Sequence, residues 1–381
     1  MSRLTVQRIF QESFGEYERT HSLPKHALHA ARRIRKCRTG ELGLHRHACP
    51  NGHYTETAPN SCRHRSCPQC RYLGVTRWIE GASRRIFSCP HFHVIFTVAH
   101  ELNPLWKQGS RVMTRIFFAS VKETLFEFLK DRRRLGVLPG IIASLQTWGG
   151  SLYFHPHIHC LVTAGGIMLD GTWRAAGNFL FPAKAASKYF RRVFLDAVER
   201  AVSSGELTLP SELSSWPKVL RKIRAKKWNV YVQSRISNPE HVVNYLGRYI
   251  RGGPIGNSRL VAITESTVTF RHMKGRNDKP MTLDRAEFIG RLLRHVPIPG
   301  LQLVRSYGLY ANNHPAVLAF PTREEEADIA NTTPKKSAAT PCCPTCGATL
   351  IFTVFRRSEI EDFKDSGCRG SPKGGINDVA A

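Results

Sequence analysis

The feature that most constrains the fold of this chain is a group of cysteines near its N-terminus. Five of the eleven cysteines lie between residues 37 and 70, where polar and basic residues dominate and no helical or strand periodicity is visible. A short segment with so little apolar surface to bury can fold by closing around a metal ion. The pair Cys67-x-x-Cys70 places two thiolates on one turn, at the separation that tetrahedral Zn²⁺ requires.

The segment therefore predicts structural zinc, bound at one site or two. The candidate ligands are Cys37, His45, Cys49, His53, Cys62, Cys67 and Cys70. The spacing leaves open which of them share an ion. The alternative, a set of incidental or buried cysteines, is disfavoured because the cysteines cluster in a polar segment.

The net charge of the chain indicates a polyanionic partner. There are 56 Lys and Arg residues against 29 Asp and Glu residues, which gives a net charge of +27. Repulsion on this scale opposes compaction and is typical of proteins that bind nucleic acid. The arginines between the candidate zinc ligands (Arg63, Arg65 and Arg71) are expected to face phosphate groups from a rigid frame.

The sequence also indicates a compartment. No run approaches the roughly 18 apolar residues that a membrane span needs, and the first twenty residues contain no apolar signal-peptide core. We therefore expect no membrane partner and a cytoplasmic location, where clustered cysteines indicate metal rather than disulfides.

Changes in residue texture along the chain predict three regions. Residues 1–85 are expected to form a helical, zinc-binding and DNA-binding domain, with two helices within residues 4–36. Residues 86–320 are expected to form an α+β domain, because strand-like and helix-like segments alternate there. Residues 321–381 are expected to contain a linker, a small cysteine-containing segment and a disordered tail.

The cysteine-containing segment near the C-terminus looks like half of a zinc ribbon. Cys343-x-x-Cys346 supplies two of the four ligands that a structural zinc site requires. On the sequence alone, only Cys342 and the distant Cys368 offer themselves as partners to complete the site.

Within the α+β domain, the sequence predicts several strands and a hairpin. Two apolar runs separated by Gly149-Gly150 indicate a β-hairpin. Runs rich in β-branched and aromatic residues indicate further strands, and the last of these strands precede a helix. The expected elements are a strand at 91–98, the hairpin of 141–148 and 152–163, short strands at 260–264 and 267–271, and a helix at 283–295.

Two histidines in the second strand of the hairpin are candidate metal ligands. His157 and His159 are two residues apart, so their side chains project from the same face of a strand. Two neutral imidazoles on a rigid strand can hold one divalent cation and leave coordination positions open for a phosphate oxygen. Gln146, on the partner strand, and Glu240 are candidates for a third ligand.

A second pair of histidines, His91 and His93, has the same spacing. Most such pairs in proteins are solvated or satisfied by neighbouring groups, so the spacing alone does not identify a metal site. The position of His157 and His159 in a hairpin, after a Gly-Gly turn, favours them as the ligands.

Two tyrosines four residues apart are candidate nucleophiles. Asn238-Pro239 is suited to the start of a helix, which would place Tyr245 and Tyr249 one turn apart on a single face. Tyrosines at this spacing are usually core residues. Residues 217–251, however, contain nine Lys and Arg against one acid, which favours a helix that faces phosphates, with Arg248 as a DNA contact. A phenol beside a metal-bound phosphate can attack it and leave a covalent phosphotyrosine.

Several motifs in a fixed order carry a resemblance to a known family. They include Asn60-Ser-Cys-Arg-His-Arg-Ser-Cys-Pro-Gln-Cys70, Phe154-His-Pro-His-Ile-His-Cys-Leu-Val162 and Asn244-Tyr-Leu-Gly-Arg-Tyr249. Over residues 25–312 the chain resembles rolling-circle transposases of bacterial insertion sequences. These enzymes combine an N-terminal zinc-binding domain with a His-hydrophobe-His (HUH), two-tyrosine catalytic domain.

The resemblance implies an HUH endonuclease-like fold: an α+β domain with an antiparallel sheet and flanking helices, preceded by the small zinc-binding domain. It implies that His157 and His159 bind Mg²⁺ or Mn²⁺ and that Tyr245 and Tyr249 are the nucleophiles. The substrate implied is single-stranded DNA at the ends of the mobile element, nicked and rejoined through 5′-phosphotyrosine intermediates. The zinc-binding segment departs from the family pattern, since Cys49 is followed by His53 where relatives tend to have Cys-x-x-Cys.

Two other functions fit parts of the sequence. A plasmid rolling-circle replication initiator or a relaxase would use the same chemistry, but the position of the tyrosine pair well after the histidines favours the transposase. A non-catalytic zinc-finger nucleic-acid-binding protein would explain the charge and the cysteines, but would leave the histidine strand and the tyrosine pair without a role.

Overall fold

The computed structural model describes residues 4–83, 85–237, 253–274, 277–311 and 341–355. Its largest part is built on a five-stranded sheet, in which every neighbouring pair of strands is antiparallel. The strand order is β12 (Val304–Gly308), β4 (Gly140–Trp148), β5 (Phe154–Thr163), β3 (His91–Thr97) and β8 (Val230–Val232). The hairpin expected from Gly149-Gly150 is the pair β4 and β5, at the centre of the sheet.

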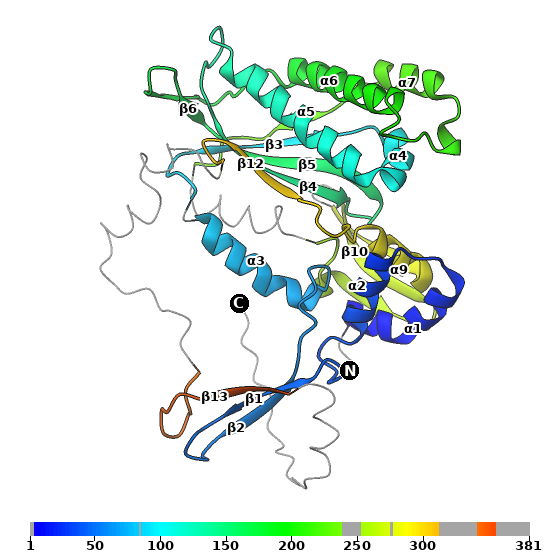
Figure 1. Ribbon diagram of the computed structural model, residues 1–381, viewed down its shortest axis with the longest axis vertical. Coiled ribbons are helices and arrows are strands. Elements are labelled where there is room, and N and C mark those ends of the chain that lie inside the picture. Colours follow the sequence, from blue (N-terminus) through cyan, green and yellow to red (C-terminus); the bar gives the residue numbers. More distant parts are fainter. Residues whose placement is uncertain (1–3, 84, 238–252, 275–276, 312–340, 356–381) are drawn as a thin grey trace.

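Helices cover one face of this sheet (Figure 1). They are α4 (Asn103–Gln108), α5 (Ser110–Lys130), α6 (Ala183–Ser203) and α7 (Trp216–Ala225), with short 3₁₀ turns at His100–Leu102 and Ser211–Leu213. Because side chains alternate along a strand, the apolar positions of β3 and β5 face these helices. Phe190 of α6 lies 5.1 Å from Phe96 of β3, measured between ring centroids. The opposite face carries the histidines.

A second lobe combines the N-terminal helices with a segment from late in the chain. Helices α1 (Val6–Thr20) and α2 (Lys25–Arg35) pack on α9 (Arg285–Arg294) and share one apolar core with it. The core also includes residues of the sheet β9 (Leu260–Ile263), β10 (Thr267–Lys274) and β11 (Asn277–Asp284). The boundary expected at residue 85 therefore does not separate two cores, because residues 4–36 pack against a segment more than 200 positions away.

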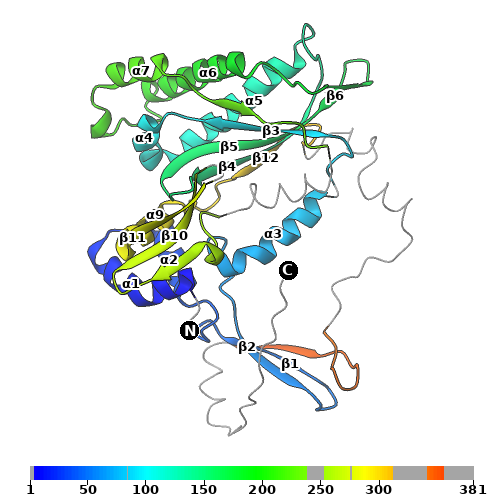
Figure 2. The same cartoon turned by 180° about the vertical axis from the view of Figure 1, so that it is seen from behind.

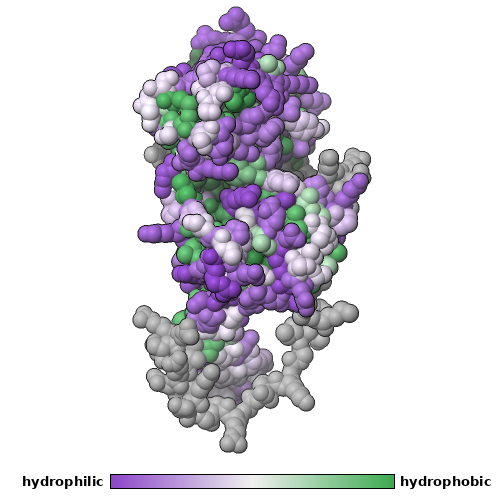
Figure 3. Space-filling model, turned by 90° about the vertical axis from the view of Figure 1, so that its right-hand side faces the viewer, coloured by the Kyte–Doolittle hydropathy of each residue, from purple (hydrophilic) through white to green (hydrophobic). Residues whose placement is uncertain are grey.

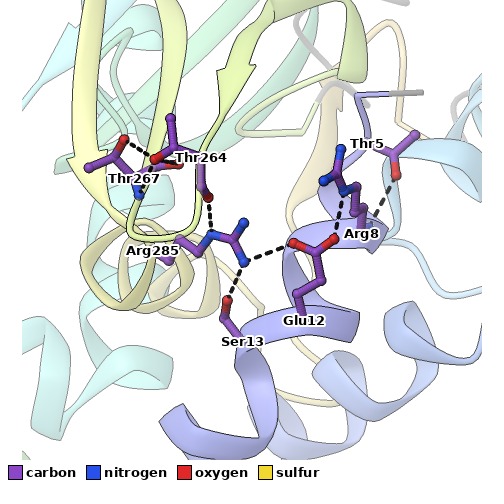
Figure 4. Close-up of polar contacts among 7 residues, drawn as sticks. All are labelled: Thr5, Arg8, Glu12, Ser13, Thr264, Thr267 and Arg285. Atoms are coloured by element: carbon purple, nitrogen blue, oxygen red, sulfur yellow. Dashed lines mark hydrogen bonds and ion pairs between the residues drawn. The ribbon is translucent and has the colours of Figure 1, made fainter. Parts of the chain in front are cut away.

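Arg285 connects the two halves of this lobe (Figure 4). Its guanidinium forms an ion pair with Glu12 of α1 (2.8 Å) and donates a hydrogen bond to the Thr264 carbonyl (2.7 Å) and another to Ser13 Oγ (3.0 Å). The Arg285 side chain is only 11% exposed. It thereby fixes α1 against the turn between β9 and β10.

A small three-stranded sheet stands apart from the two lobes (Figure 2). Its strand order is β13 (Ile351–Phe355), β1 (Leu44–Ala48) and β2 (Thr55–Pro59). Helix α3 (Pro68–Ser83) leads from it towards β3. The C-terminal cysteine segment therefore joins the N-terminal domain as a strand, and does not stand as a separate piece. The tail expected to be disordered, residues 356–381, lies outside the described residues.

Two smaller features complete the described part. Strands β6 (Gly165–Ile167) and β7 (Trp173–Ala175) form a two-stranded sheet after β5, and a 3₁₀ turn at Asn257–Arg259 precedes β9. Among the described helices, none is both long and apolar enough to cross a membrane. Mixed helices and antiparallel sheets confirm the predicted α+β class.

Candidate active site and cysteine clusters

The hairpin β4–β5 brings the predicted metal ligands together on the face of the sheet away from α5 and α6. Gln146 lies directly opposite His157 in the antiparallel register, and Ser144 lies opposite His159. The rings of His157 and His159 are 4.7 Å apart between centroids. The fold thus places one amide and two imidazoles side by side, in the arrangement that the sequence predicts.

Both imidazoles are neutral at pH 7. His157 is 9% exposed and His159 is 5% exposed. Burial lowers the pKa of His157 to about 4, and burial together with the neighbouring His157 and His93 lowers the pKa of His159 to about 2. A neutral imidazole carries the lone pair that a metal ion needs.

Hydrogen bonds determine which nitrogen carries that lone pair. The His155 carbonyl accepts from His157 Nδ1 at 2.7 Å, so the proton is on Nδ1 and the lone pair is on Nε2. Gln233 Oε1 accepts from His93 Nδ1 at 2.6 Å, so His93 Nε2 in turn accepts from His159 Nδ1 at 2.8 Å. The lone pair of His159 is therefore also on Nε2. Such outer hydrogen bonds orient metal-ligating histidines.

The second His-x-His pair has other roles. His91 is fully buried, and its Nε2 lies 2.6 Å from the Tyr310 hydroxyl. His93, on the same face of β3, contacts His159 through its Nε2. The role of His93 and Gln233 in orienting His159 was missed by the sequence analysis, because it depends on the pairing of β3 with β5 and on the segment that follows β8.

The cysteines near the N-terminus form one buried cluster. The sulfurs of Cys37, Cys62, Cys67 and Cys70 all lie within 4.8 Å of one another, with Cys70 at 3.4 Å from Cys37 and 3.5 Å from Cys62. Hydrogen bonds from the Cys62 and Cys67 thiols lower the pKa of Cys37. Four sulfurs at this separation match the tetrahedral geometry of a structural zinc site.

A second cluster combines both ends of the chain. Cys49 and His53 lie with Cys343 and Cys346, again with their ligand atoms within 4.8 Å of one another. The expectation that Cys342 or Cys368 completes the C-terminal pair was wrong for Cys342, which is exposed and belongs to neither cluster. Cys368 lies outside the described residues.

Among the seven candidate zinc ligands near the N-terminus, His45 is the one that the structure places in neither cluster. It lies within β1, and its Nδ1 is 2.9 Å from Asn60 Oδ1. The strand pairing of β1 with β2 determines this position, since residues 44–48 run away from the sulfurs of Cys37 and Cys62 as part of a sheet.

Comparison with known proteins identifies the family. Residues 140–316 match the family model described as a putative transposase, and residues 9–98 match the model of a transposase zinc-binding domain. The putative transposase y4qJ of Sinorhizobium fredii is 35% identical over 321 residues, which cover 81% of each chain. The chain belongs to this family of insertion-sequence transposases.

A second relative agrees with this assignment. The transposase of insertion sequence element IS801 from Pseudomonas savastanoi pv. phaseolicola is 29% identical to this transposase over 287 residues, covering 72% of this chain and 68% of that relative. The predicted resemblance is therefore confirmed, and the replication-initiator and non-catalytic readings are not favoured. The zinc-binding model includes all of Cys37, Cys62, Cys67 and Cys70, which together with the clusters supports structural zinc.

One solved structure is similar over part of the chain. It is the N-terminal nuclease domain of non-structural protein 1 of minute virus of mice, at 14% sequence identity and a TM-score of 0.20. The similarity covers 57% of this transposase and 79% of that domain.

The predicted nucleophiles fall in a segment outside the described residues. Tyr245, Tyr249, Arg248 and the alternative ligand Glu240 belong to residues 238–252. The chain enters this segment beside the sheet, because Ile236 exchanges two backbone hydrogen bonds with His91 (2.7 and 3.0 Å).

The three predicted phosphate-facing arginines differ in position. Arg63 and Arg65 are exposed on the loop that carries Cys62 and Cys67. Arg71 contradicts the expectation, because it turns into the protein: its Nη1 is shielded from solvent and lies against Gly253. Burial lowers the pKa of Arg71. Its place in the first turns of α3 directs it towards the chain near Gly253 and away from the surface.

Proposed function

We propose that this transposase nicks and rejoins single-stranded DNA at the ends of its mobile element through 5′-phosphotyrosine intermediates. The observation that carries this proposal is the pair of neutral imidazoles, His157 and His159, with their lone pairs on Nε2 and the Gln146 amide opposite. The amide oxygen is a ligand type that suits Mg²⁺ and Mn²⁺, and the two neutral imidazoles would add nitrogen donors to the same ion. The bound ion would neutralise charge on the scissile phosphate and polarise it.

The covalent chemistry belongs to the tyrosines. The Tyr245 or Tyr249 oxygen attacks the phosphorus, the bond from phosphorus to the 3′ oxygen breaks, and the proton lost by the phenol ends on the 3′ hydroxyl. In the rejoining step a 3′ hydroxyl attacks the phosphotyrosine and the phenol is released. Each step exchanges one phosphodiester for another, so no nucleotide cofactor is required. Two tyrosines allow one cut end to be held while the next strand is cut.

DNA contacts are proposed for the exposed arginines of the zinc-binding domain and for Arg248. Arg63 and Arg65 are exposed on a loop that begins and ends at cysteines of the first cluster. Zinc at that cluster would hold the loop rigid, so that both guanidiniums keep one orientation towards a phosphate backbone. Figure 3 shows a mainly hydrophilic side of the molecule, in keeping with the excess of Lys and Arg. Because its substrate is the DNA of the cell, we place this activity in the cytoplasm.

A covalent-adduct assay tests the tyrosines. An oligonucleotide that carries one element end and a 3′ label is incubated with the transposase and Mg²⁺ or Mn²⁺, and then separated under denaturing conditions. The unmodified transposase is expected to become labelled, and the double variant Tyr245→Phe, Tyr249→Phe is expected not to. Tyr231→Phe, at an exposed tyrosine of β8, is the matched control and should keep the adduct. If the double variant cleaves as well as the unmodified transposase, the tyrosines are not the nucleophiles, and attack by a metal-activated water molecule is the better explanation.

A second set of variants tests the metal ligands. His157→Ala is expected to abolish cleavage while binding of the oligonucleotide stays within about twofold, because phosphate contacts from Lys and Arg are separate from the metal. Gln146→Ala should raise the Mn²⁺ concentration needed for half-maximal cleavage by about ten- to a hundredfold, as expected for a weakened ligand set. His100→Ala, at a side chain that is 77% exposed, is the control. Normal cleavage by His157→Ala would show that the metal needed for cleavage does not bind at this hairpin.

A further inference from the structure

The C-terminal strand β13 completes the sheet of the zinc-binding domain. All five of its residues pair with β1, from Leu44 opposite Phe355 to Ala48 opposite Ile351. Without it, β1 and β2 would be a two-stranded hairpin, which is marginally stable in water. The small sheet therefore depends on an interaction that keeps β13, from near the C-terminus, paired with β1, from near the N-terminus.

Apolar burial does not explain how β13 is held. Its large side chains are mostly in solvent, since Ile351 is 55% exposed, Phe352 is 54% exposed and Val354 is 51% exposed. The only buried residues that form a cluster here, among the residues that the structure describes, are Cys49, Cys343 and Leu350. Two of these three residues are cysteines of the second cluster, so little apolar surface is buried at the centre of this small domain.

The four candidate ligands sit on two similar turns. In the first turn the Gly52 amide donates to the Cys49 carbonyl (3.0 Å), and in the second the Gly347 amide donates to the Cys343 carbonyl (2.9 Å). Both glycines have positive φ, at 77° and 70°, which side chains other than glycine rarely allow. The backbone amide of Asn51 donates a hydrogen bond to Cys49 Sγ at 3.4 Å, a contact that favours the thiolate form of Cys49.

The separation of the sulfurs matches shared coordination. Cys49 Sγ is 3.5 Å from Cys346 Sγ, close to the roughly 3.8 Å between two sulfurs on a tetrahedral ion with Zn–S bonds of about 2.3 Å. It is well beyond the S–S bond length of a disulfide, about 2.05 Å. Three sulfurs and one imidazole complete four-coordination, which is typical of a structural site with no position left for substrate.

We propose that Cys49, His53, Cys343 and Cys346 bind a second zinc ion, which fastens the C-terminal segment to the N-terminal zinc-binding domain. Two of the four ligands lie outside both matched family models, which end at residues 98 and 316. His53 takes the place of a second cysteine in the first turn, so that the site has three thiolates and one imidazole. Binding releases the protons of the three thiols and involves no change of oxidation state.

Metal content tests the site directly. The full-length transposase, purified without chelator, is expected to contain two zinc ions per chain by elemental analysis. The variant Cys343→Ser, Cys346→Ser is expected to contain one, and Cys49→Ser, from the other end of the chain, should lose the same single ion. Cys342→Ser is the matched control, since Cys342 is an exposed neighbour outside the cluster, and it should keep two. One ion in the unmodified protein, or two in the double variant, would overturn the proposal.

Cobalt substitution distinguishes the two sites. Co²⁺ bound by four thiolates and Co²⁺ bound by three thiolates and an imidazole absorb at different visible wavelengths. The unmodified protein should show both bands, and the double variant should lose only that of the mixed site. Loss of both bands would mean that the clusters are not independent and would contradict a separate second site.

Retention of the cleaved C-terminal segment tests the fastening role. A recognition site for a specific endoprotease is inserted between residues 330 and 331 of the full chain. After cleavage the C-terminal fragment should co-elute with the rest of the protein, and should separate from it on addition of a zinc chelator or in the double variant. Co-elution that survives both treatments would show that zinc does not hold the segment.

Discussion

His91 offers a test that separates a structural histidine from the proposed metal ligands on the same face of the sheet. Its side chain is fully buried, and its Nε2 lies 2.6 Å from the Tyr310 hydroxyl. Burial lowers the pKa of His91 to about 4, from an ordinary value of 6.5. The substitution His91→Gln keeps a polar group near Tyr310 but removes the group that titrates.

The sign of the effect follows from the direction of this shift. In the unfolded chain His91 gains a proton near pH 6.5, whereas in the folded protein it stays neutral down to about pH 4. Above pH 6.5 His91 is neutral in both states and does not affect the pH dependence of stability. As the pH falls from 6.5 towards 4, the unfolded chain gains a proton that the folded protein does not, so the free energy of unfolding decreases. By pH 5 the loss is about 2 kcal/mol, and below pH 4 it levels off near 3 kcal/mol.

The assay is urea unfolding followed by tryptophan fluorescence, with the unmodified protein and His91→Gln compared at pH 7 and pH 5. At pH 7 we expect the variant to be less stable by about 1 kcal/mol, through its altered hydrogen bond to Tyr310. At pH 5 the difference should disappear or reverse, because the variant lacks the titrating group. Contributions from other acid-sensitive groups, including the cysteine clusters, cancel in the difference in unfolding free energy, since both proteins contain these groups.

Two results would refute this account of His91. Parallel pH dependence in the two proteins would mean that His91 is not held neutral by burial. Loss of DNA cleavage in His91→Gln at pH 7, with the fold intact, would mean that His91 belongs to the proposed metal site rather than to the structure around Tyr310.

Two further predictions concern the cores of the two lobes, and both are measured as changes in the free energy of urea unfolding. Arg285→Met should cost about 2 kcal/mol, because it removes a largely buried guanidinium that pairs with Glu12 and donates to the Thr264 carbonyl and to Ser13 Oγ. Arg8→Met, which removes a more exposed ion pair to the same Glu12, should cost under about 1 kcal/mol, and equal effects would contradict the role of Arg285. Phe190→Ala should cost about 3–5 kcal/mol, since the ring is fully buried between the sheet and α5. Phe179→Ala, at a ring that is 68% exposed, should change stability by no more than about 0.5 kcal/mol, and a cost above about 1 kcal/mol would contradict this reading.

Much of the five-stranded sheet was predictable because its signals are local. The run at 91–98 became β3, and the two runs around Gly149-Gly150 became β4 and β5 within two residues of the expected ends. Strand β11 was not predicted. Its segment, Asn277–Asp284, contains Pro280 and few apolar residues, and it is a strand because it pairs with β10.

Long-range contacts were the part that the sequence could not supply. The helices expected within residues 4–36 do form, as α1 and α2, but their apolar faces do not identify α9 as the partner. The same limit applies to the second cysteine cluster. Both of its halves are visible as motifs, yet only the pairing of β13 with β1 brings Cys343 and Cys346 to Cys49 and His53.

The two His-x-His pairs show why an identical spacing can serve two purposes on one sheet. Strands β3 and β5 are antiparallel, with His91 opposite Thr163 and Thr97 opposite His157, so the two pairs begin at opposite ends of the shared ladder. At one end the Tyr310 hydroxyl lies within hydrogen-bonding distance of His91 Nε2. Towards the other end His93 Nε2 accepts a hydrogen bond from His159 Nδ1, which leaves the His159 lone pair on Nε2, and the His159 ring lies 4.7 Å from that of His157. A His-x-His motif thus becomes a metal-binding candidate through its place in the register, because one neighbouring strand, β3, supplies a hydrogen-bond acceptor for His159 and the other, β4, supplies the Gln146 amide opposite His157.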